Sequence, residues 1–273
     1  MSFKVVIPAR YGSTRLPGKP LVDLAGKPMV QHVWERAQAS GAEDVVLATD
    51  DARIEAAART FGAQVCLTSV HHPSGSDRIA EVAARMGWPD DAIVVNLQGD
   101  EPLTPPCIVR QVAENLAAHP QAVMATLCTP ISRAAQLYDP HTVKVVRDDR
   151  DFALYFSRAP IPWERDALDM EVSPALQVCQ RHLGLYAYRV GYLKRFTRME
   201  SCTLERIERL EQLRALYHGA RIHVDVALET PPAGVDTQED VERVTLVLRS
   251  LAAVAAGHAT TGPAGHGGGP AAG

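Results

Sequence analysis

The chain has 273 residues, of which 46% are hydrophobic and 22% are charged, and its formal net charge is -4. This composition is typical of a soluble globular protein, and the length allows one large α/β domain or two small ones. The acidic balance argues against a sequence-independent nucleic-acid binder, because such proteins need a basic surface.

Cysteine usage and the lack of long apolar runs exclude further classes. The five cysteines are odd in number and never occur as Cys-x-x-Cys, so neither a disulfide framework nor a zinc knuckle is expected. No signal peptide precedes the first predicted strand, and no apolar run is long enough to cross a membrane. We therefore expect a soluble, cytoplasmic protein without membrane insertion.

The first half of the chain alternates predicted strands with predicted helices. The expected strands cover residues 3–9, 44–49, 64–67 and 92–97. The expected helices cover about residues 28–40, 51–61, 76–86 and 105–118, with Asp50 or Asp51 as the cap of the second. This alternation predicts right-handed crossovers and an α/β fold, in which a mostly parallel central sheet carries helices on both faces.

The second half is richer in predicted strands, and residues 140–190 form a small β-rich subregion. The expected strands cover residues 122–129, 142–147, 152–157, 181–188 and 221–228, the second and third of them forming a hairpin. A surface loop is expected over residues 162–178. The expected helices cover residues 204–218, capped by Thr203, and 237–255.

The predicted helix over residues 204–218 has a strong apolar period. Its inward face is expected to hold Ile207, Leu210, Leu213 and Leu216. After the last helix, residues 257–273 are low in complexity and lack apolar side chains that could pack. We therefore expect a single domain over residues 1–256, followed by a disordered tail.

The connection after the first strand combines cations, glycines and hydroxyl groups. These residues are Arg10, Gly12, Ser13, Thr14, Arg15, Gly18 and Lys19. Three cations on a glycine-containing loop predict a polyphosphate site. The loop is not a Walker A motif, because Pro20 follows the lysine, and no Gly-x-Gly-x-x-Gly opens the next helix. A solvated basic loop is the alternative, but a connection this long is usually functional.

Polar residues follow each of the four predicted strands of the first half. They are residues 10–19, 49–51, 73–78 and 96–101. In open α/β sheets the carboxyl ends of the parallel strands meet at one edge, where ligands bind. We therefore expect these four groups to surround one site.

Asp100 is the best candidate for a metal ligand, because it follows a buried strand and a glycine. A carboxylate at this place can hold Mg²⁺ against phosphate oxygens. A helix cap is the alternative, but Asp100 lies too far upstream of Pro105 for that. Glu101 is a weaker candidate that also fits a solvated side chain.

A second carboxylate, Asp236, lies at the entrance of the last predicted helix. Asp236 or Thr237, followed by Glu239 and Asp240, matches an ordinary capped helix start. From the residues alone, a cap is therefore the favoured interpretation of Asp236.

The sequence offers no evident protein nucleophile. It contains neither a Gly-x-Ser-x-Gly elbow nor a His-Glu-x-x-His motif. His71 and His72 are interpreted as surface residues and His32 as a structural residue, whereas His182 stays open as a functional residue. Phosphoryl and nucleotidyl transfer depend on positioning and charge neutralisation, which agrees with this inventory.

Seven segments together resemble the sugar-activating cytidylyltransferases. They are residues 10–21, 74–78, 96–102, 155–162, 181–186, 210–214 and 234–237. They occur in the family's order between about residues 3 and 247, so the resemblance covers nearly the whole folded chain. The first segment alone indicates the wider family, and the later ones narrow the resemblance to members that act on 3-deoxy-manno-octulosonate (Kdo) in lipopolysaccharide synthesis.

The resemblance implies a Rossmann-like nucleotidyltransferase fold, in which the β-rich subregion serves dimerisation and substrate binding. It implies a homodimer that transfers CMP from CTP to the anomeric hydroxyl of Kdo, with Mg²⁺ as cofactor and pyrophosphate as the second product. In this reaction Lys19, Arg15 and Asp100 are the implied catalytic residues.

The resemblance also implies roles for individual residues. Arg10, Ser13, Thr14, Arg15 and Lys19 are expected to hold the triphosphate. Thr49, Asp50, Ser74 and Arg78 are expected to bind cytosine and ribose, and Asp100 and Asp236 to share a magnesium ion. Gln98, Arg158, His182, Tyr186, Glu211 and Gln212 are expected to form the sugar pocket. From the residues alone, Glu211 and Gln212 fit an exposed helix face equally well.

Two other functions compete with this interpretation. The acceptor could be an acylneuraminate or a related nonulosonate, with the same chemistry. The chain could also be a non-catalytic nucleotide-binding module on the same scaffold, and the retention of both Asp100 and Asp236 argues against that.

Overall fold

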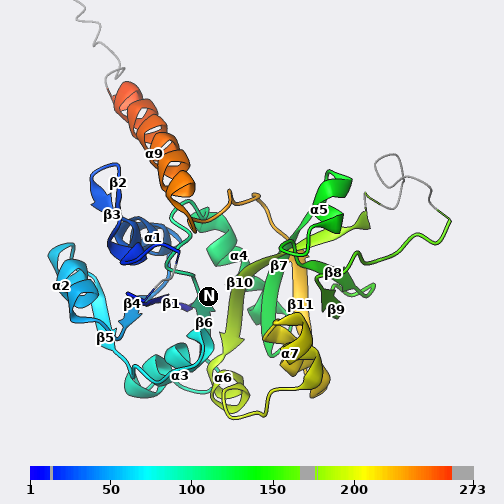
Figure 1. The fold of residues 1–273 in the computed structure, drawn as a ribbon. Coiled ribbons are helices and arrows are strands. Elements are labelled where there is room, and N and C mark those ends of the chain that lie inside the picture. The colour runs from blue at the N-terminus through cyan, green and yellow to red at the C-terminus, as the bar shows by residue number, and fades with distance from the viewer. Residues whose placement is uncertain (13–14, 167–175, 177, 260–273) are drawn as a thin grey trace, which may run out of the picture.

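A nine-stranded sheet runs through the described part of the chain, which comprises residues 1–12, 15–166, 176 and 178–259 of this computed structural model (Figure 1). Its strands follow the order β11-β7-β10-β6-β1-β4-β5, and β8 and β9 extend it beside β10.

The first half of the chain alternates strands and helices as predicted. The strands are β1 (Lys4–Ala9), β4 (Asp44–Thr49), β5 (Gln64–Leu67) and β6 (Ile93–Asn96). The helices are α1 (Met29–Ala39), α2 (Ala52–Thr60), α3 (Gly75–Arg85) and α4 (Pro106–Ala118). All neighbouring pairs among these four strands are parallel, so their carboxyl ends share one edge of the sheet. Asp51 caps α2, and Ser74 forms a capping box with Asp77 at α3.

The long connection before α1 holds three short elements that the sequence did not predict. They are the 3-10 helix η1 (Lys19–Leu21) and the two-residue strands β2 (Asp23–Leu24) and β3 (Lys27–Pro28). Such short elements have no detectable periodicity, and their turn depends on positive φ angles at Ala25 and Gly26. The 3-10 helix places Lys19 at a defined position.

The second half adds strands that run in both directions. They are β7 (Met124–Pro130), β8 (Lys144–Arg147), β9 (Ala153–Ser157), β10 (Gln180–Arg189) and β11 (Ile222–Val226). The helices are α5 (Ala134–Tyr138), α6 (Val190–Phe196), α7 (Thr203–Glu208), α8 (Gln212–Tyr217) and α9 (Gln238–Ala259). Strand β10 runs antiparallel to β6 and β7, whereas β11 is parallel to β7. The predicted hairpin is confirmed as β8–β9.

The single helix predicted over residues 204–218 is wrong. The chain divides into α7 and α8 at Arg209, which has left-handed backbone angles (φ 53°, ψ 48°). Cys202 rather than Thr203 caps α7, and Ile207 is 74% exposed instead of facing inward. Leu210 and Leu213 are buried, as predicted. The apolar period is nearly continuous across the break, so the sequence pattern alone cannot reveal it.

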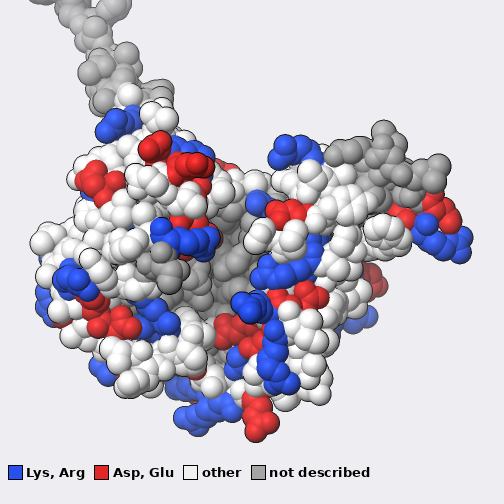
Figure 2. Space-filling model, viewed as in Figure 1, with Lys and Arg blue, Asp and Glu red and all other residues white. Residues whose placement is uncertain are grey.

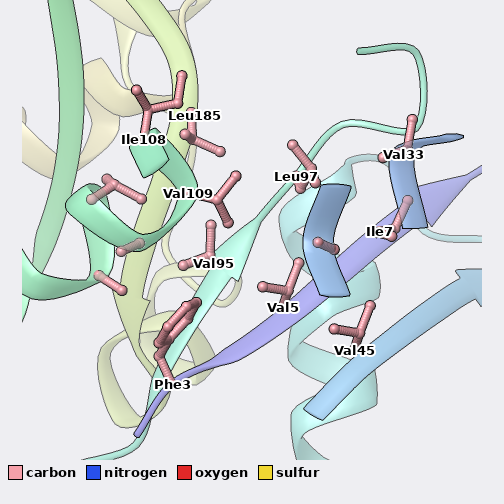
Figure 3. Close-up of a cluster of buried hydrophobic side chains, with 14 of the residues drawn as sticks. Phe3, Val5, Ile7, Val33, Val45, Val95, Leu97, Ile108, Val109 and Leu185 are labelled. Atoms are coloured by element: carbon pink, nitrogen blue, oxygen red, sulfur yellow. The ribbon is translucent and has the colours of Figure 1, made fainter. Parts of the chain in front are cut away.

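Helices cover both faces of the sheet, as predicted. One apolar cluster joins the β1 residues Val5 and Ile7 to α1, α2 and α4, and Figure 3 shows Val33 and Val109 of those helices beside the strand residues. The opposite cluster joins the β1 residue Val6 to α3, α6 and α8. Because adjacent side chains of β1 enter both clusters, this strand is buried on both sides, as a central parallel strand must be.

Helix α9 closes the fold over a third apolar cluster. Val241 and Val244 pack with Leu24, Met29 and Val235. The helix continues to Ala259 rather than ending at Ala255. The disordered tail expected over residues 257–273 stays a prediction. Residues 260–273 and most of the loop predicted over residues 162–178 lie outside the described part of the chain. None of the described helices combines the length and the apolar character that spanning a membrane requires.

Candidate active site

A pocket of about 400 Å³ lies at the carboxyl ends of β1 and β6. Its polar and charged lining comes from Arg10, Arg15, Lys19, Gln98, Asp100 and Asp236, and glycines 12, 75 and 99 complete its wall. The view in Figure 2 shows the molecule hollowed between its two halves, with acidic and basic side chains gathered along the hollow. The sequence predicted five of these six residues at one sheet edge, and the structure adds Asp236, which from the residues alone was expected only at a helix start.

Lys19 is the centre of this pocket. Its Nζ donates to Oδ2 of Asp100 at 2.6 Å and to Oδ1 of Asp236 at 2.9 Å. Burial alone would lower the pKa of Lys19, but the hydrogen bonds and charges of the two aspartates raise it above its ordinary value. The lysine is therefore a permanent cation between two carboxylates.

Close backbone contacts place the two carboxylates near each other. The amide of Val235 donates to the carbonyl oxygen of Asp100 at 2.9 Å, and a Cβ on Gly234 would lie only 2.9 Å from the same oxygen. A Cβ on Gly99 would lie 2.8 Å from the carbonyl oxygen of Pro8. Only glycine fits at both positions, so the distance between the two aspartate loops is set by the backbone.

The helix-cap interpretation of Asp236 is wrong. The carboxylate of Asp240 accepts hydrogen bonds from the amides of Asp236 and Thr237, and Thr237 Oγ1 accepts from the amide of Asp240. Thr237 and Asp240 thus satisfy the start of α9 between them. The side chain of Asp236 is directed instead to Lys19 and to Arg15, whose Nη2 lies 3.0 Å away.

The two carboxylates fit a magnesium ion. Both lie within hydrogen-bond distance of one ammonium group, so their oxygens already face a common cation. No group of three or more His, Cys, Asp or Glu side chains suited to a metal occurs among the described residues. Mg²⁺ prefers hard oxygen ligands and is often held by one or two carboxylates plus substrate phosphates, so two aspartates are sufficient.

The remaining residues of the cationic loop are placed differently. Arg10 donates from Nη2 to the carbonyl oxygens of His72 at 2.6 Å and Ser74 at 3.3 Å, which ties the loop to the start of α3. Arg15 is mostly exposed at the pocket mouth. Ser13 and Thr14, predicted to hold the triphosphate, lie outside the described residues.

Three of the four residues predicted to bind cytosine and ribose, Thr49, Asp50 and Arg78, lie in a hydrogen-bonded group at the end of β4. Arg78 is fully buried and donates to Asp50 at 2.6 Å and to Thr68. Thr49 is also buried, and its Oγ1 accepts from the amide of Asp51. These contacts join the end of β4 to α3, and none of these side chains lines the pocket. Their role in nucleotide binding stays a prediction.

Three of the predicted sugar residues line a second pocket of about 380 Å³, beside β10. They are His182, Tyr186 and Gln212. Gln212 is buried and its Nε2 has no hydrogen-bond partner, so the exposed-face alternative is wrong for this residue. A buried donor without a partner at a pocket wall is costly unless a ligand accepts from it.

His182 is uncharged at neutral pH, because burial lowers its pKa to about 3. Thr126 Oγ1 lies 3.0 Å from Nε2 of His182 and within 2.9 Å of the carbonyl oxygens of Leu183 and Leu185. Its one hydroxyl hydrogen goes to a carbonyl, so the oxygen accepts from Nε2–H of His182. His182 therefore offers Nδ1 as an acceptor and does not act as a cation.

Glu211 lines neither the pocket at Lys19 nor the pocket beside β10. Ser74 Oγ and Ser76 Oγ donate to its two carboxylate oxygens at 3.1 and 3.0 Å. Burial raises the pKa of Glu211 above its ordinary value. Ser74 and Glu211 line a third pocket, of about 600 Å³. Gln98 donates to Asn96 from the wall of the first pocket.

Arg158 is not directed into any of these pockets. Its guanidinium donates to the carbonyl oxygens of Glu208 at 2.7 Å and Pro140 at 2.8 Å. The fully buried ammonium of Lys144 donates to the carbonyl oxygen of Arg158 as well. The contact of Arg158 with the sugar stays a prediction.

Two residues near the site were missed or misjudged from the sequence. Arg181 lines the pocket beside β10 and an adjoining one of about 180 Å³, where the charge of Glu101 faces it. Glu101 is not a freely solvated side chain, because burial and the charge of Asp100 raise its pKa to about 7. Arg181 directly precedes His182 in the sequence, and this position beside a candidate site residue could have identified it.

Known proteins resemble this chain over most of its length. A family model described as cytidylyltransferase matches residues 4–222. The chain is 65% identical over 250 residues to a 3-deoxy-manno-octulosonate cytidylyltransferase of Thioalkalivibrio sulfidiphilus, covering 92% of this chain and 100% of the relative. A relative with the same name from Pseudomonas syringae is 59% identical over 249 residues, covering 90% and 98%.

A solved structure has the same fold. It is described as CMP:2-keto-3-deoxy-manno-octonic acid synthetase complexed with CTP, and it is 43% identical, with a TM-score of 0.83 over 92% of this chain and 100% of that one. The predicted α/β nucleotidyltransferase fold is thereby confirmed. The family model and the full-length relatives lead to one conclusion: the chain belongs to the cytidylyltransferase family.

Proposed function

We propose that this chain transfers CMP from CTP to the anomeric hydroxyl of Kdo, with CMP-Kdo and pyrophosphate as products. The observation that carries the proposal is the pocket in which the cationic loop meets Asp100 and Asp236. The relatives named for this activity are more than half identical over at least nine-tenths of this chain. CMP-Kdo formed in this way serves lipopolysaccharide synthesis.

The chemistry needs no protein nucleophile. The anomeric hydroxyl of Kdo attacks the α-phosphorus of CTP in line, the bond to the β-phosphate oxygen breaks, and pyrophosphate leaves. Arg10, Arg15 and Lys19 bind the triphosphate and offset the negative charge that develops on the leaving group. Asp100 and Asp236 would hold Mg²⁺, which would supply further stabilisation of the charge on the phosphates.

The sugar acid lies in the pocket beside β10. The unpartnered Nε2 of Gln212 and the acceptor Nδ1 of neutral His182 match hydroxyl groups of a sugar. The guanidinium of Arg181, which lines this pocket, has the charge that a carboxylate on the acceptor requires. Gln98 lines the triphosphate pocket, and Glu211 accepts from Ser74, a residue expected to bind the nucleotide.

We also propose a cytoplasmic homodimer formed through the β8–β9 hairpin. Strand β9 pairs only with β8 among the described strands, and Leu154 on it is exposed. An apolar side chain on an open strand edge is a typical contact between copies. The five cysteines are free thiols, which suits a reducing compartment. Light scattering of the purified chain tests the dimer.

The decisive experiment is an acceptor and nucleotide screen. Purified protein is assayed for pyrophosphate release with CTP, UTP or GTP and Mg²⁺, with Kdo or N-acetylneuraminate as the acceptor. We expect release with CTP and Kdo. Equal or faster release with N-acetylneuraminate would instead support a nonulosonate acceptor. CTP binding without release for any sugar acid would support the non-catalytic nucleotide-binding module.

A further inference from the structure

The position of Lys19 has a consequence beyond phosphate binding. Its ammonium group is hydrogen-bonded to both carboxylates that suit a divalent cation, at 2.6 Å from Asp100 and 2.9 Å from Asp236. An ammonium group and a metal ion cannot use the same oxygens at the same distance. Each therefore weakens the binding of the other.

The charges at this point already balance. The two carboxylates carry two negative charges, and Lys19 supplies one positive charge to both of them while Arg15 supplies another to Asp236 alone. Arg15 is two-thirds exposed, so its charge is screened, whereas the Lys19 side chain is only 12% exposed. A divalent cation added beside a retained Lys19 would meet strong repulsion.

A triphosphate changes this balance. It brings several negative charges into a pocket that Arg10, Arg15 and Lys19 line together, and it offers the lysine new partners. When the ammonium turns to the phosphates, the two carboxylates lose the cation that they share and can accept a metal ion in its place. Nucleotide and metal would then favour each other's binding by the same factor.

We propose that Lys19 competes with the divalent cation for Asp100 and Asp236, so that the metal binds tightly only after a nucleoside triphosphate has drawn the lysine away. The proposal rests on the proposed function in taking this pocket as the triphosphate site. The two aspartate loops do not depend on Lys19 for their arrangement, because the amide of Val235 donates a hydrogen bond to the carbonyl oxygen of Asp100. A variant without the lysine therefore keeps two neighbouring carboxylates.

The test is calorimetric titration of Mn²⁺ into protein without nucleotide. We expect Lys19→Met and Lys19→Gln to bind Mn²⁺ on the order of tenfold more tightly than the unsubstituted protein, because one repelling charge is gone. Lys19→Arg keeps the charge and should stay weak. Lys194→Met is the matched control, since Lys194 pairs with Asp90 at 2.9 Å outside the pocket and its loss changes the net charge equally.

The tighter Mn²⁺ binding must also depend on the carboxylates. The double variant Lys19→Met, Asp100→Asn should therefore bind Mn²⁺ no more tightly than the unsubstituted protein. Unchanged or weaker Mn²⁺ binding in Lys19→Met and Lys19→Gln, with native circular dichroism spectra, would overturn the proposal. So would an equal gain in Lys194→Met. None of these outcomes depends on turnover, so they are distinct from a failure of the acceptor screen.

Discussion

At the scale of single residues, the carboxylates of Asp100 and Asp236 define the site. The place of Asp100 after a strand predicts a metal ligand, and in the structure its side chain is partly exposed and hydrogen-bonded to Lys19. Asp236 resembles a helix cap in the sequence, yet Thr237 and Asp240 perform that task. Local sequence could not separate these roles, because three polar residues at a helix start fit the same pattern.

Replacing Asp100 with Asn tests the metal assignment. We expect pyrophosphate release to fall by about a hundredfold or more, because a neutral amide neither holds Mg²⁺ nor balances Lys19. The midpoint of thermal unfolding should change little, since the side chain is partly exposed. Asp90→Asn, which removes a carboxylate from an exposed pair with Lys194, should leave both unchanged. A large loss of stability with activity retained would make Asp100 a structural residue.

The neutral state of His182 makes stability depend on pH. Its pKa is about 3 in the folded chain and about 6.5 in an unfolded one, so only the unfolded chain gains a proton between these values. The stabilising contribution is complete above pH 6.5 and decreases as the pH falls below it. Folding raises the pKa of Glu101 from 4.5 to about 7, so this residue makes the folded state more stable as the pH falls through that range. Because the two effects oppose each other, a variant is needed to measure the contribution of His182.

His182→Gln removes this pH dependence. When the pH is lowered from 7 to 5, the free energy of unfolding of this variant should rise by roughly 1–2 kcal/mol relative to that of the unsubstituted protein. The size follows from the distance of at most about 1.5 pH units between pH 5 and the pKa of histidine in the unfolded chain. Urea unfolding at the two pH values measures it. His71→Gln is the control, since His71 is exposed. An identical pH response in both variants would show that folding does not lower the pKa of His182.

At the scale of elements, backbone conformation and backbone hydrogen bonds decide where the residues of the pocket beside β10 lie. The left-handed angles of Arg209 separate α7 from α8 and place Gln212 in the pocket wall. Lys144, fully buried, donates to the carbonyl oxygens of Asp139, Thr142 and Arg158 and so joins the turn before β8 to the end of β9. A lysine in a predicted strand gives no indication of such a role.

Lys144→Met should lower the free energy of unfolding by about 2–4 kcal/mol, because three carbonyl groups lose a charged donor. Lys194→Met removes an exposed ion pair and should cost no more than about 0.5 kcal/mol. Both are measured by urea unfolding at pH 7. Equal stability of the two variants would mean that water or a rearranged side chain replaces the Lys144 ammonium.

At the scale of the whole molecule, the site draws on the chain from Pro8 to Asp236, and α9 closes the fold through Val241 and Val244. A chain that ends at Ala259 should therefore keep full pyrophosphate release and an unchanged unfolding midpoint. A chain that ends at Gln238 should lose about 3 kcal/mol or more, because the apolar cluster under α9 becomes exposed. Loss of activity in the longer chain would give residues 260–273 a function.

The sequence by itself determined the alternating first half of the fold and the edge at which ligands bind. Apolar periods and caps are local properties, and parallel strands necessarily end at one edge. Tertiary structure decided which polar side chains share a site. Lys19, Asp100 and Asp236 are brought together by the close backbone contact at Gly234, and Arg78 is withdrawn into a buried ion pair with Asp50. Such choices depend on contacts between residues far apart in the chain, which no local pattern encodes.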